Sequence, residues 1–350
     1  MNRKISIMSK NRCLLGNVTG ISLVEMMIAM LVSLILLGGM YRLFISSSTG
    51  YDFESEMSNL QENGRFTLEF LTRDIRMAGY RGCAGRNAEI FSTLNNGSDF
   101  LYNFGQAIVG YDNMTSPPPT DLSAIAPVAG TDVLVLRRQI SDNAVQITKK
   151  MPDTSADLTI SNNPSEPIKT DDIVMITDCQ ASTVFQVTHA NYPTSGADAN
   201  MVHNTGTSSP GNFQKELHHS YDEGAEISVM ETQIYFVGLN GATGRPGLFQ
   251  RRGGTNEEIV GGVENMQITY GVDTSDDGAI DSYVVAGGVA DWNDVLAVRI
   301  GLLIASLDEI PRAEIDNAAR NVNGVAVAAA NDRRLRYVFV TTVAIRNRLE

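Results

Sequence analysis

The most pronounced hydrophobic pattern in the chain is an almost unbroken apolar run over residues 21–41. As a helix it would be roughly 31 Å long, at about 1.5 Å per residue, which is enough to cross the core of a bilayer. Basic residues precede the run and acidic residues follow it, so we expect the N-terminus inside the cell and the rest outside. A secretory signal has a shorter apolar region, of roughly 7–15 residues, so the pattern favours a membrane anchor.

A second pattern continues directly from this run. Apolar positions and one glycine recur at intervals of three and four, at Phe53, Met57, Leu60, Gly64, Leu68, Leu71 and Ile75. This spacing predicts one helix over about 21–78, whose second half turns one face to a globular core, with Gly79 as its C-cap. A coiled coil would show the same stripe, but the run is short and contains a glycine.

After Tyr80 the pattern changes to short segments rich in Val and Ile, bounded by Gly, Asn, Asp or Pro. These segments predict strands at 132–140, 172–177, 183–188, 227–237, 263–270, 294–305 and 335–345. Few helical crossovers separate them, so the pairing should be mostly antiparallel. We expect a long surface loop or disorder over 190–212, and a short helix within 311–331 that ends near Asn323-Gly324. The sequence thus predicts an α+β protein, with the helix 21–79 packed on a β-rich globular domain of residues 80–350.

Net charge and the absence of known catalytic motifs argue against two classes of function, nucleic-acid binding and catalysis. The 350 residues have a formal net charge of −13, which argues against binding to a nucleic-acid backbone. The sequence contains no G-x-S-x-G, H-E-x-x-H or Walker A motif. We therefore predict a protein that is not an enzyme.

Glu25 is a carboxylate inside the apolar run, where a charge costs roughly 2.5–3.5 kcal/mol at the bilayer centre. Cleavage after Gly20 would give Ile21 a new α-amino group, about 6 Å up the helix from Glu25. An amine of a neighbouring subunit could then pair with the carboxylate. Alternatively, Glu25 extends to the cytoplasmic interface.

The same segment resembles the prepilin signature of type IV pilins and of type II secretion pseudopilins, in the run Gly20-Ile21-Ser22-Leu23-Val24-Glu25. The resemblance implies that residues 1–20 are a leader, cut after Gly20 by a prepilin peptidase. It also implies N-methylation of Ile21 and a role for Glu25 in subunit assembly. Met8 is an alternative start that would shorten the leader.

Further segments resemble PilW-type minor pilins: residues 61–66 and 74–83 at the end of the helix, residues 178–179 followed by 184–188, and the closing run 339–347. This resemblance implies a type IV pilin-like fold and a non-catalytic subunit that helps to prime pilus assembly near the filament tip. Its implied partners are other minor pilins, the major pilin, the inner-membrane assembly platform and a tip adhesin. The protein would be a single-pass inner-membrane protein with a periplasmic domain before assembly, and would then join the pilus at the cell surface.

The cysteines predict one cross-link. Cys13 would be lost with the leader, leaving Cys83 and Cys179. Outside the inner membrane an even pair favours a disulfide, and both residues lie in segments that resemble the family. The alternative is two free buried thiols.

One acidic loop resembles a shortened EF-hand loop. Its candidate calcium ligands are Asp273, Ser275, Asp277 and Asp281, with Gly278 at the turn and no glutamate at the twelfth position. The alternative is a solvated hairpin turn. Apart from this possible structural calcium, no cofactor is expected.

Two other functions remain open. A J-type pseudopilin of a type II secretion system would use the same N-terminal helix, and its gene neighbours would distinguish it from a pilus protein. An uncleaved membrane-anchored module that binds calcium or another ligand, or an enzyme of unrecognised type, would instead keep the Gly20–Ile21 bond intact.

Overall fold

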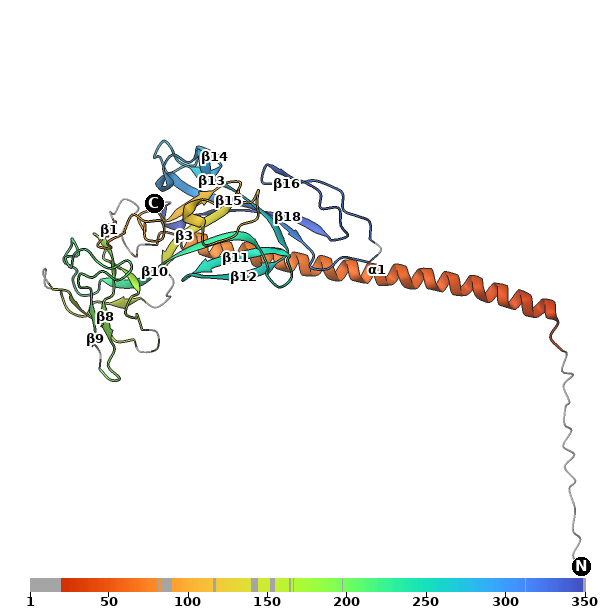
Figure 1. Cartoon of the computed structure of the whole chain (residues 1–350), viewed down its shortest axis with the longest axis horizontal. Helices are drawn as coiled ribbons and strands as arrows, with labels where there is room; N and C mark the ends of the chain where they lie inside the picture. Colours follow the sequence, from red (N-terminus) through yellow and green to blue (C-terminus); the bar gives the residue numbers. More distant parts are fainter. Residues whose placement is uncertain are drawn as a thin grey trace, which may run out of the picture. The chain divides into compact units, whose positions relative to one another are not determined.

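The computed structural model describes residues 20–80, 82, 90–115, 118–139, 144–151, 155–163, 165, 167–196, 198–311 and 313–348. The chain divides into two compact units, Met1–Asp52 and Phe53–Glu350. Helix α1 (Leu23–Arg76) contributes to both units (Figure 1). This confirms the long helix predicted from the apolar run and the stripe. The chain turns at Gly79, whose φ of 67° is a left-handed conformation that glycine adopts without strain.

The second unit is built around a nine-stranded sheet. Its central path is β1-β7-β6-β10-β11-β12; β3 and β4 also pair with β10, and β2 pairs with β3. The strands are β1 (Ile90–Ser92), β2 (Ile108–Tyr111), β3 (Val133–Gln139), β4 (Val145–Gln146), β6 (Ile173–Thr177), β7 (Ser182–Gln186), β10 (Glu226–Leu239), β11 (Pro246–Arg252) and β12 (Thr255–Gly261). All pairs are antiparallel except β1 with β7.

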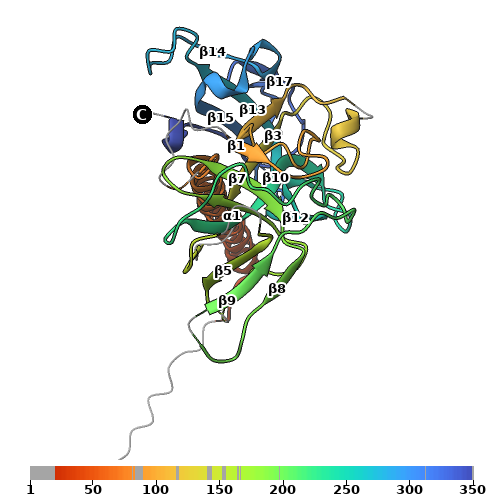
Figure 2. The ribbon, with the colours of Figure 1, turned by 90° about the vertical axis from the view of Figure 1, so that its left-hand side faces the viewer.

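Three smaller sheets complete the unit. The four-stranded sheet has the order β14 (Ser282–Val284), β13 (Val263–Val272), β15 (Val295–Ala305) and β18 (Arg336–Ala344). The others are β5 (Asp157–Ser161), β9 (Asp198–Val202) and β8 (His189–Asn191), and the pair β16 (Arg320–Val322) and β17 (Val325–Val327). The described residues also form short 3-10 helices, η1 (Thr120–Leu122), η2 (Ala286–Gly288), η3 (Trp292–Asp294) and η4 (Arg346–Arg348). Figure 2 shows β5, β8 and β9 on the opposite side of the domain from β13 and β15.

The seven predicted strands correspond to β3, β6, β7, β10, β13, β15 and β18, so the mostly antiparallel α+β fold is confirmed. Two local predictions were wrong. Residues 311–331 contain the β16–β17 hairpin and no helix, because Asn323 and Gly324 both have positive φ and form a tight turn between two short strands. The segment 190–212 is not one loop, since β9 lies within it and pairs with β5.

The second half of α1 packs on these sheets through a narrow buried face. Its buried residues are Leu60, Gly64, Thr67, Leu71, Asp74 and Ile75. Leu71 and Ile75 join the main hydrophobic core, which contains side chains of β10, β13 and β15. The predicted stripe is therefore confirmed over its C-terminal half, with two polar side chains, Thr67 and Asp74, that the apolar pattern did not indicate.

Gly64 is a point of close approach between α1 and β18. A Cβ atom added to Gly64 would overlap the ring of Phe339. We expect Gly64→Ala to destabilise the domain, because the cost of overpacking, about 1–3 kcal/mol, exceeds the gain of about 1 kcal/mol in helix propensity. In a Phe339→Ala background the ring is gone, so the same substitution should stabilise the domain instead.

The test compares the unfolding midpoints of four proteins: the wild type, the two single variants and the double variant. The effect of Gly64→Ala on stability should change from destabilising to stabilising when Phe339 is replaced. A Gly64→Ala effect of the same sign and size in both backgrounds would show that the ring does not require glycine.

Candidate functional site

The N-terminal end of α1 holds the residues that the sequence singled out first. Gly20, Ile21 and Ser22 precede the helix and are exposed. The Glu25 carboxylate accepts a hydrogen bond from the backbone N–H of Ser22, at 3.1 Å, and the Ser22 carbonyl accepts one from the N–H of Met26. The glutamate thus reaches back to the residue that caps the helix, as in one half of a capping box. The S-x-x-E spacing in the sequence already carried this signal.

The apolar run has no protein cover in the single chain. Every large apolar side chain from Ile21 to Phe44 is exposed, by between 48% and 80%. The helix is long and apolar enough to cross a membrane, and none of its apolar window is buried. An apolar surface of this extent is not stable against water, so lipid or other protein chains must cover it.

A buried polar network fixes the other end of α1 to the nine-stranded sheet. Asp74 is 3% exposed, and one of its carboxylate oxygens lies 3.1 Å from Nη2 of Arg138 on β3. Its other oxygen accepts a hydrogen bond from the hydroxyl of Tyr235 on β10. Gln250 of β11 donates to the same hydroxyl at 2.6 Å. Two neighbouring strands, β3 and β10, therefore bind one carboxylate of the helix, and β11 supports it through the Tyr235 hydroxyl.

This network also keeps the Tyr235 phenol protonated. Burial raises the pKa of the Tyr235 phenol above its ordinary value, and the nearby Asp74 carboxylate raises it further. Tyr235 therefore remains a neutral donor to Asp74. Arg138 is itself held by Gln233, whose side-chain oxygen accepts from its Nε at 3.0 Å.

The chain that follows Asp74 is attached to the sheets as well. Ala78 forms a bridge with Arg138, and the N–H of Gly79 donates to the carbonyl of Arg137 at 3.1 Å. A Cβ on Gly79 would lie 2.6 Å from Cβ of Ala107, which leaves room only for glycine. Asn347, near the chain's end, donates to the carbonyl of Ala78 at 3.3 Å. The segments 74–83 and 339–347, which both resemble PilW-type proteins, therefore meet at the end of α1.

The predicted disulfide is not tested by the structure, because Cys83 lies outside the described residues. Cys179 lies in the turn between β6 and β7. Gly82, one residue before Cys83, lies against the end of β6, where its added Cβ would be 2.8 Å from Cγ2 of Thr177. Gly82 and Cys179 line the same cavity, of about 520 Å³. The Cys83–Cys179 pairing stays a prediction that this proximity supports.

The turn that carries Cys179 is held by Asp178. One carboxylate oxygen accepts from the backbone amides of Gln180 and Ala181, at 2.8 and 2.9 Å, and the other lies 2.8 Å from Nε2 of His219. Partial burial acts to raise the pKa of Asp178, but these hydrogen bonds outweigh it and the pKa is lowered. The Asp178 carboxylate therefore stays ionised and keeps the turn in one conformation.

The predicted calcium loop lies between β13 and β14. The carboxylates of Asp273 and Asp281 accept hydrogen bonds from backbone amides of the same loop. The buried Asp273 carboxylate accepts two backbone amides of the loop, at 2.9 and 3.2 Å. Asp281 accepts two more, and hydrogen bonds from the hydroxyl and amide of Thr274 lower its pKa. In the part of the chain that the structure describes, no three His, Cys, Asp or Glu side chains are grouped to hold a metal ion. Calcium binding by Asp273, Ser275, Asp277 and Asp281 stays an untested prediction.

Comparison with known families matches one region of the chain. Residues 234–347, about a third of the chain, match the family model PilW, described as type IV pilus-assembly protein W. The matched region begins within β10, ends in η4 and includes Tyr235 and Asn347, which bind the end of α1. A search of curated proteins and a search of solved structures gave no match. The family resemblance predicted from the sequence is confirmed.

Proposed function

We propose that this PilW-family protein is a minor pilin, a subunit that acts by entering a type IV pilus and not by catalysis. The family match supports a protein of type IV pilus assembly. Within that process, we propose that the chain is a filament subunit with a position near the filament tip.

The observation that carries the proposal is the exposed apolar run of α1, preceded by Gly20 and capped by Ser22 and Glu25. Before assembly, lipid covers these side chains, and the helix anchors the protein in the inner membrane with its domain in the periplasm. After assembly, the helices of other subunits cover them instead. The transfer from lipid to filament keeps the apolar surface out of water at every stage.

The Asp74 network would attach the second half of α1 firmly to the globular domain within the filament. Load that reaches this part of the helix is transmitted to the domain through a charged pair with β3 and a hydrogen bond from Tyr235 of β10, which β11 holds in turn. The charged pair and hydrogen bonds of this buried network favour one arrangement of its side chains, and the amide nitrogen of Gln233 has no hydrogen-bond partner among the described residues. The domain would therefore follow the helix without rotating on it when the filament is pulled.

The proposed partners follow from these steps. Prepilin peptidase removes residues 1–20 and N-methylates Ile21, and the inner-membrane assembly platform moves the subunit into the filament. Other minor pilins and the major pilin cover the apolar run, and a tip adhesin is the expected neighbour at the distal end. A J-type pseudopilin would use the same steps, and we prefer the pilus because of the PilW match.

The N-terminal sequence and intact mass of the protein from native membranes and sheared filaments test the proposal. We expect the chain to begin at N-methylated Ile21 in both fractions, in a host with an active prepilin peptidase. A chain that begins at Met1 or Met8 in such a host would contradict the proposal and favour an uncleaved membrane-anchored module. Recovery of the processed chain from a secretion pseudopilus instead would favour the J-type alternative.

A further inference from the structure

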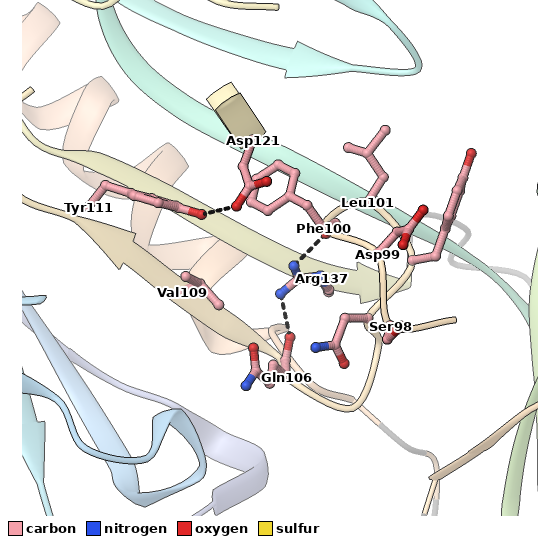
Figure 3. A pocket seen from close by; sticks show the side chains of 11 residues that line it. Ser98, Asp99, Phe100, Leu101, Gln106, Val109, Tyr111, Asp121 and Arg137 are labelled. Carbon is pink, nitrogen blue, oxygen red and sulfur yellow. Dashed lines mark hydrogen bonds between the residues drawn. The ribbon is translucent and has the colours of Figure 1, made fainter. Parts of the chain in front are cut away.

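A polar cleft of about 620 Å³ opens beside β2 and β3 on the globular domain. One wall is the loop 98–106, between β1 and β2, and the other is formed by Val109, Tyr111, Asp121 and Arg137 (Figure 3). Its volume lies within the range of about 300–1,000 Å³ that is typical of small-molecule sites. None of its residues belongs to the N-terminal helix or to the Asp74 network.

The loop wall is held in place before any ligand arrives. Arg137 is 2% exposed, and its two terminal nitrogens donate to the carbonyls of Gln106 and Phe100, at 2.8 and 2.5 Å (Figure 3). Its guanidinium also lies over the ring of Phe100, 5.6 Å from the centroid. On the other side of the loop, Thr232 of β10 donates to the carbonyl of Leu101 at 2.7 Å. A wall fixed at three carbonyls loses little conformational entropy when it binds a ligand.

The cleft presents aromatic rings next to planar polar groups. The ring of Tyr111 packs edge-on against Phe100, with centroids 6.3 Å apart, and its hydroxyl donates to Asp121 at 3.3 Å. Burial first, and then the Asp121 carboxylate, raise the pKa of Tyr111 to about 12, so it remains a neutral hydroxyl. Among the described residues, no partner binds the side-chain amides of Asn103 and Gln106, which also line the cleft.

We propose that this cleft binds a neutral oligosaccharide. Planar carboxylates and amides bind pairs of neighbouring sugar hydroxyls, with the carboxylate as acceptor and the amide as both donor and acceptor. Aromatic rings pack against the C–H faces of a pyranose ring. Asp99, Asp121, Asn103 and Gln106 supply the first kind of group, and the half-exposed rings of Tyr102 and Tyr111 supply the second, with Phe100 packed behind them by Arg137.

An anionic ligand fits the cleft less well. Asp99 and Asp121 are exposed at its surface, and the whole protein carries a net charge of −13, so an anion is repelled. Arg137 is the cation in the wall, but its terminal nitrogens already bind two carbonyls and its side chain is buried. It therefore positions the wall, and its Nε, which has no hydrogen-bond partner among the described residues, is buried out of reach of a carboxylate or phosphate.

The test uses the full chain in lipid nanodiscs on an array of neutral, carboxylated and sulfated oligosaccharides. Alkyl maltoside detergents are avoided, because their disaccharide head group would compete for the cleft. We expect binding to at least one class of neutral oligosaccharide, and weaker or no binding to the charged ones. Calorimetry with the best neutral oligosaccharide then gives the affinity of each variant.

The double variant Asn103→Ala/Gln106→Ala should weaken this affinity at least tenfold while leaving the unfolding midpoint unchanged, because neither side chain holds the fold. Tyr111→Phe, which removes a hydroxyl and keeps the ring, should weaken it less. The matched control is Asn191→Ala/Gln180→Ala, which removes two exposed amides outside the cleft and should bind like the wild type.

Three results would overturn the proposal: no neutral oligosaccharide bound above empty nanodiscs, preference for charged glycans, or equal affinity in the cleft and control double variants. The measurement needs neither processing nor filaments. Its failure is therefore distinguishable from failure of the pilin role.

Discussion

Asp74→Ala should lower the free energy of unfolding of the domain by about 3 kcal/mol, the lower end of the cost of breaking a buried ion pair. The substitution leaves the charge of Arg138 without its carboxylate partner in a largely buried site, and the buried Tyr235 hydroxyl keeps only the Gln233 side-chain oxygen, at 3.0 Å, as an acceptor. We choose the lower end because the Arg138 side chain keeps 15% of its exposure to water.

Unfolding of the full chain by denaturant, followed by fluorescence, measures this effect. Trp292 is the single tryptophan, and the centroid of its ring lies 4.9 Å from that of Tyr270 on β13. Because Tyr270 belongs to the main hydrophobic core, the fluorescence of Trp292 reports on unfolding of that core. Glu69→Ala is the control, since Glu69 is an exposed acid on the same helix and its loss should change stability by less than about 0.5 kcal/mol.

A second variant separates the charge from the hydrogen bonds. Asp74→Asn keeps an acceptor for Tyr235 but removes the charge that Arg138 requires, so its loss of stability should lie between those of the alanine variant and the control. If Asp74→Ala were as stable as Glu69→Ala, the network would not hold the helix on the sheet.

The second large effect is expected at the other end of α1. Glu25→Ala should insert in the membrane and be processed, but fail to enter filaments. In the proposed assembly step, this carboxylate pairs with the N-terminal amine of a neighbouring subunit. Immunoblots of sheared filaments and of membranes from cells that express each variant give the ratio of incorporated to membrane-bound protein.

Glu25→Gln distinguishes the two roles that one carboxylate has. Glutamine can still accept the hydrogen bond from the Ser22 N–H, as it does in many capping boxes, but it has no charge to pair with an amine. We expect Glu25→Gln to be absent from filaments like Glu25→Ala. Glu54→Ala, which removes an exposed acid further along the same helix, should be incorporated like the wild type.

If Glu25→Gln enters filaments at the wild-type level while Glu25→Ala does not, helix capping is the function of this residue. The proposed charge pairing would then be wrong.

Several features of this protein could be predicted from residues that are neighbours in the sequence. The apolar run 21–41 and the three-and-four spacing of Leu60, Leu71 and Ile75 predicted the helix and its buried face, because helix geometry places such positions on one side. Alternating Val and Ile residues predicted seven strands for a similar reason. The Ser22-x-x-Glu25 spacing contained the helix cap, and Asn323-Gly324 contained the hairpin turn that the predicted helix over 311–331 missed.

The tertiary structure decided which distant residues act together. Asp74 is a polar residue within an amphipathic helix, and its burial depends on Tyr235, 161 residues further along the chain. The cleft combines a loop after β1 with side chains of β2, β3 and η1. Local propensity and periodicity specify which face of an element avoids water, and this protein's long helix follows from them. Partners across the sheets depend on strand order and register, which long-range packing selects and no local pattern encodes.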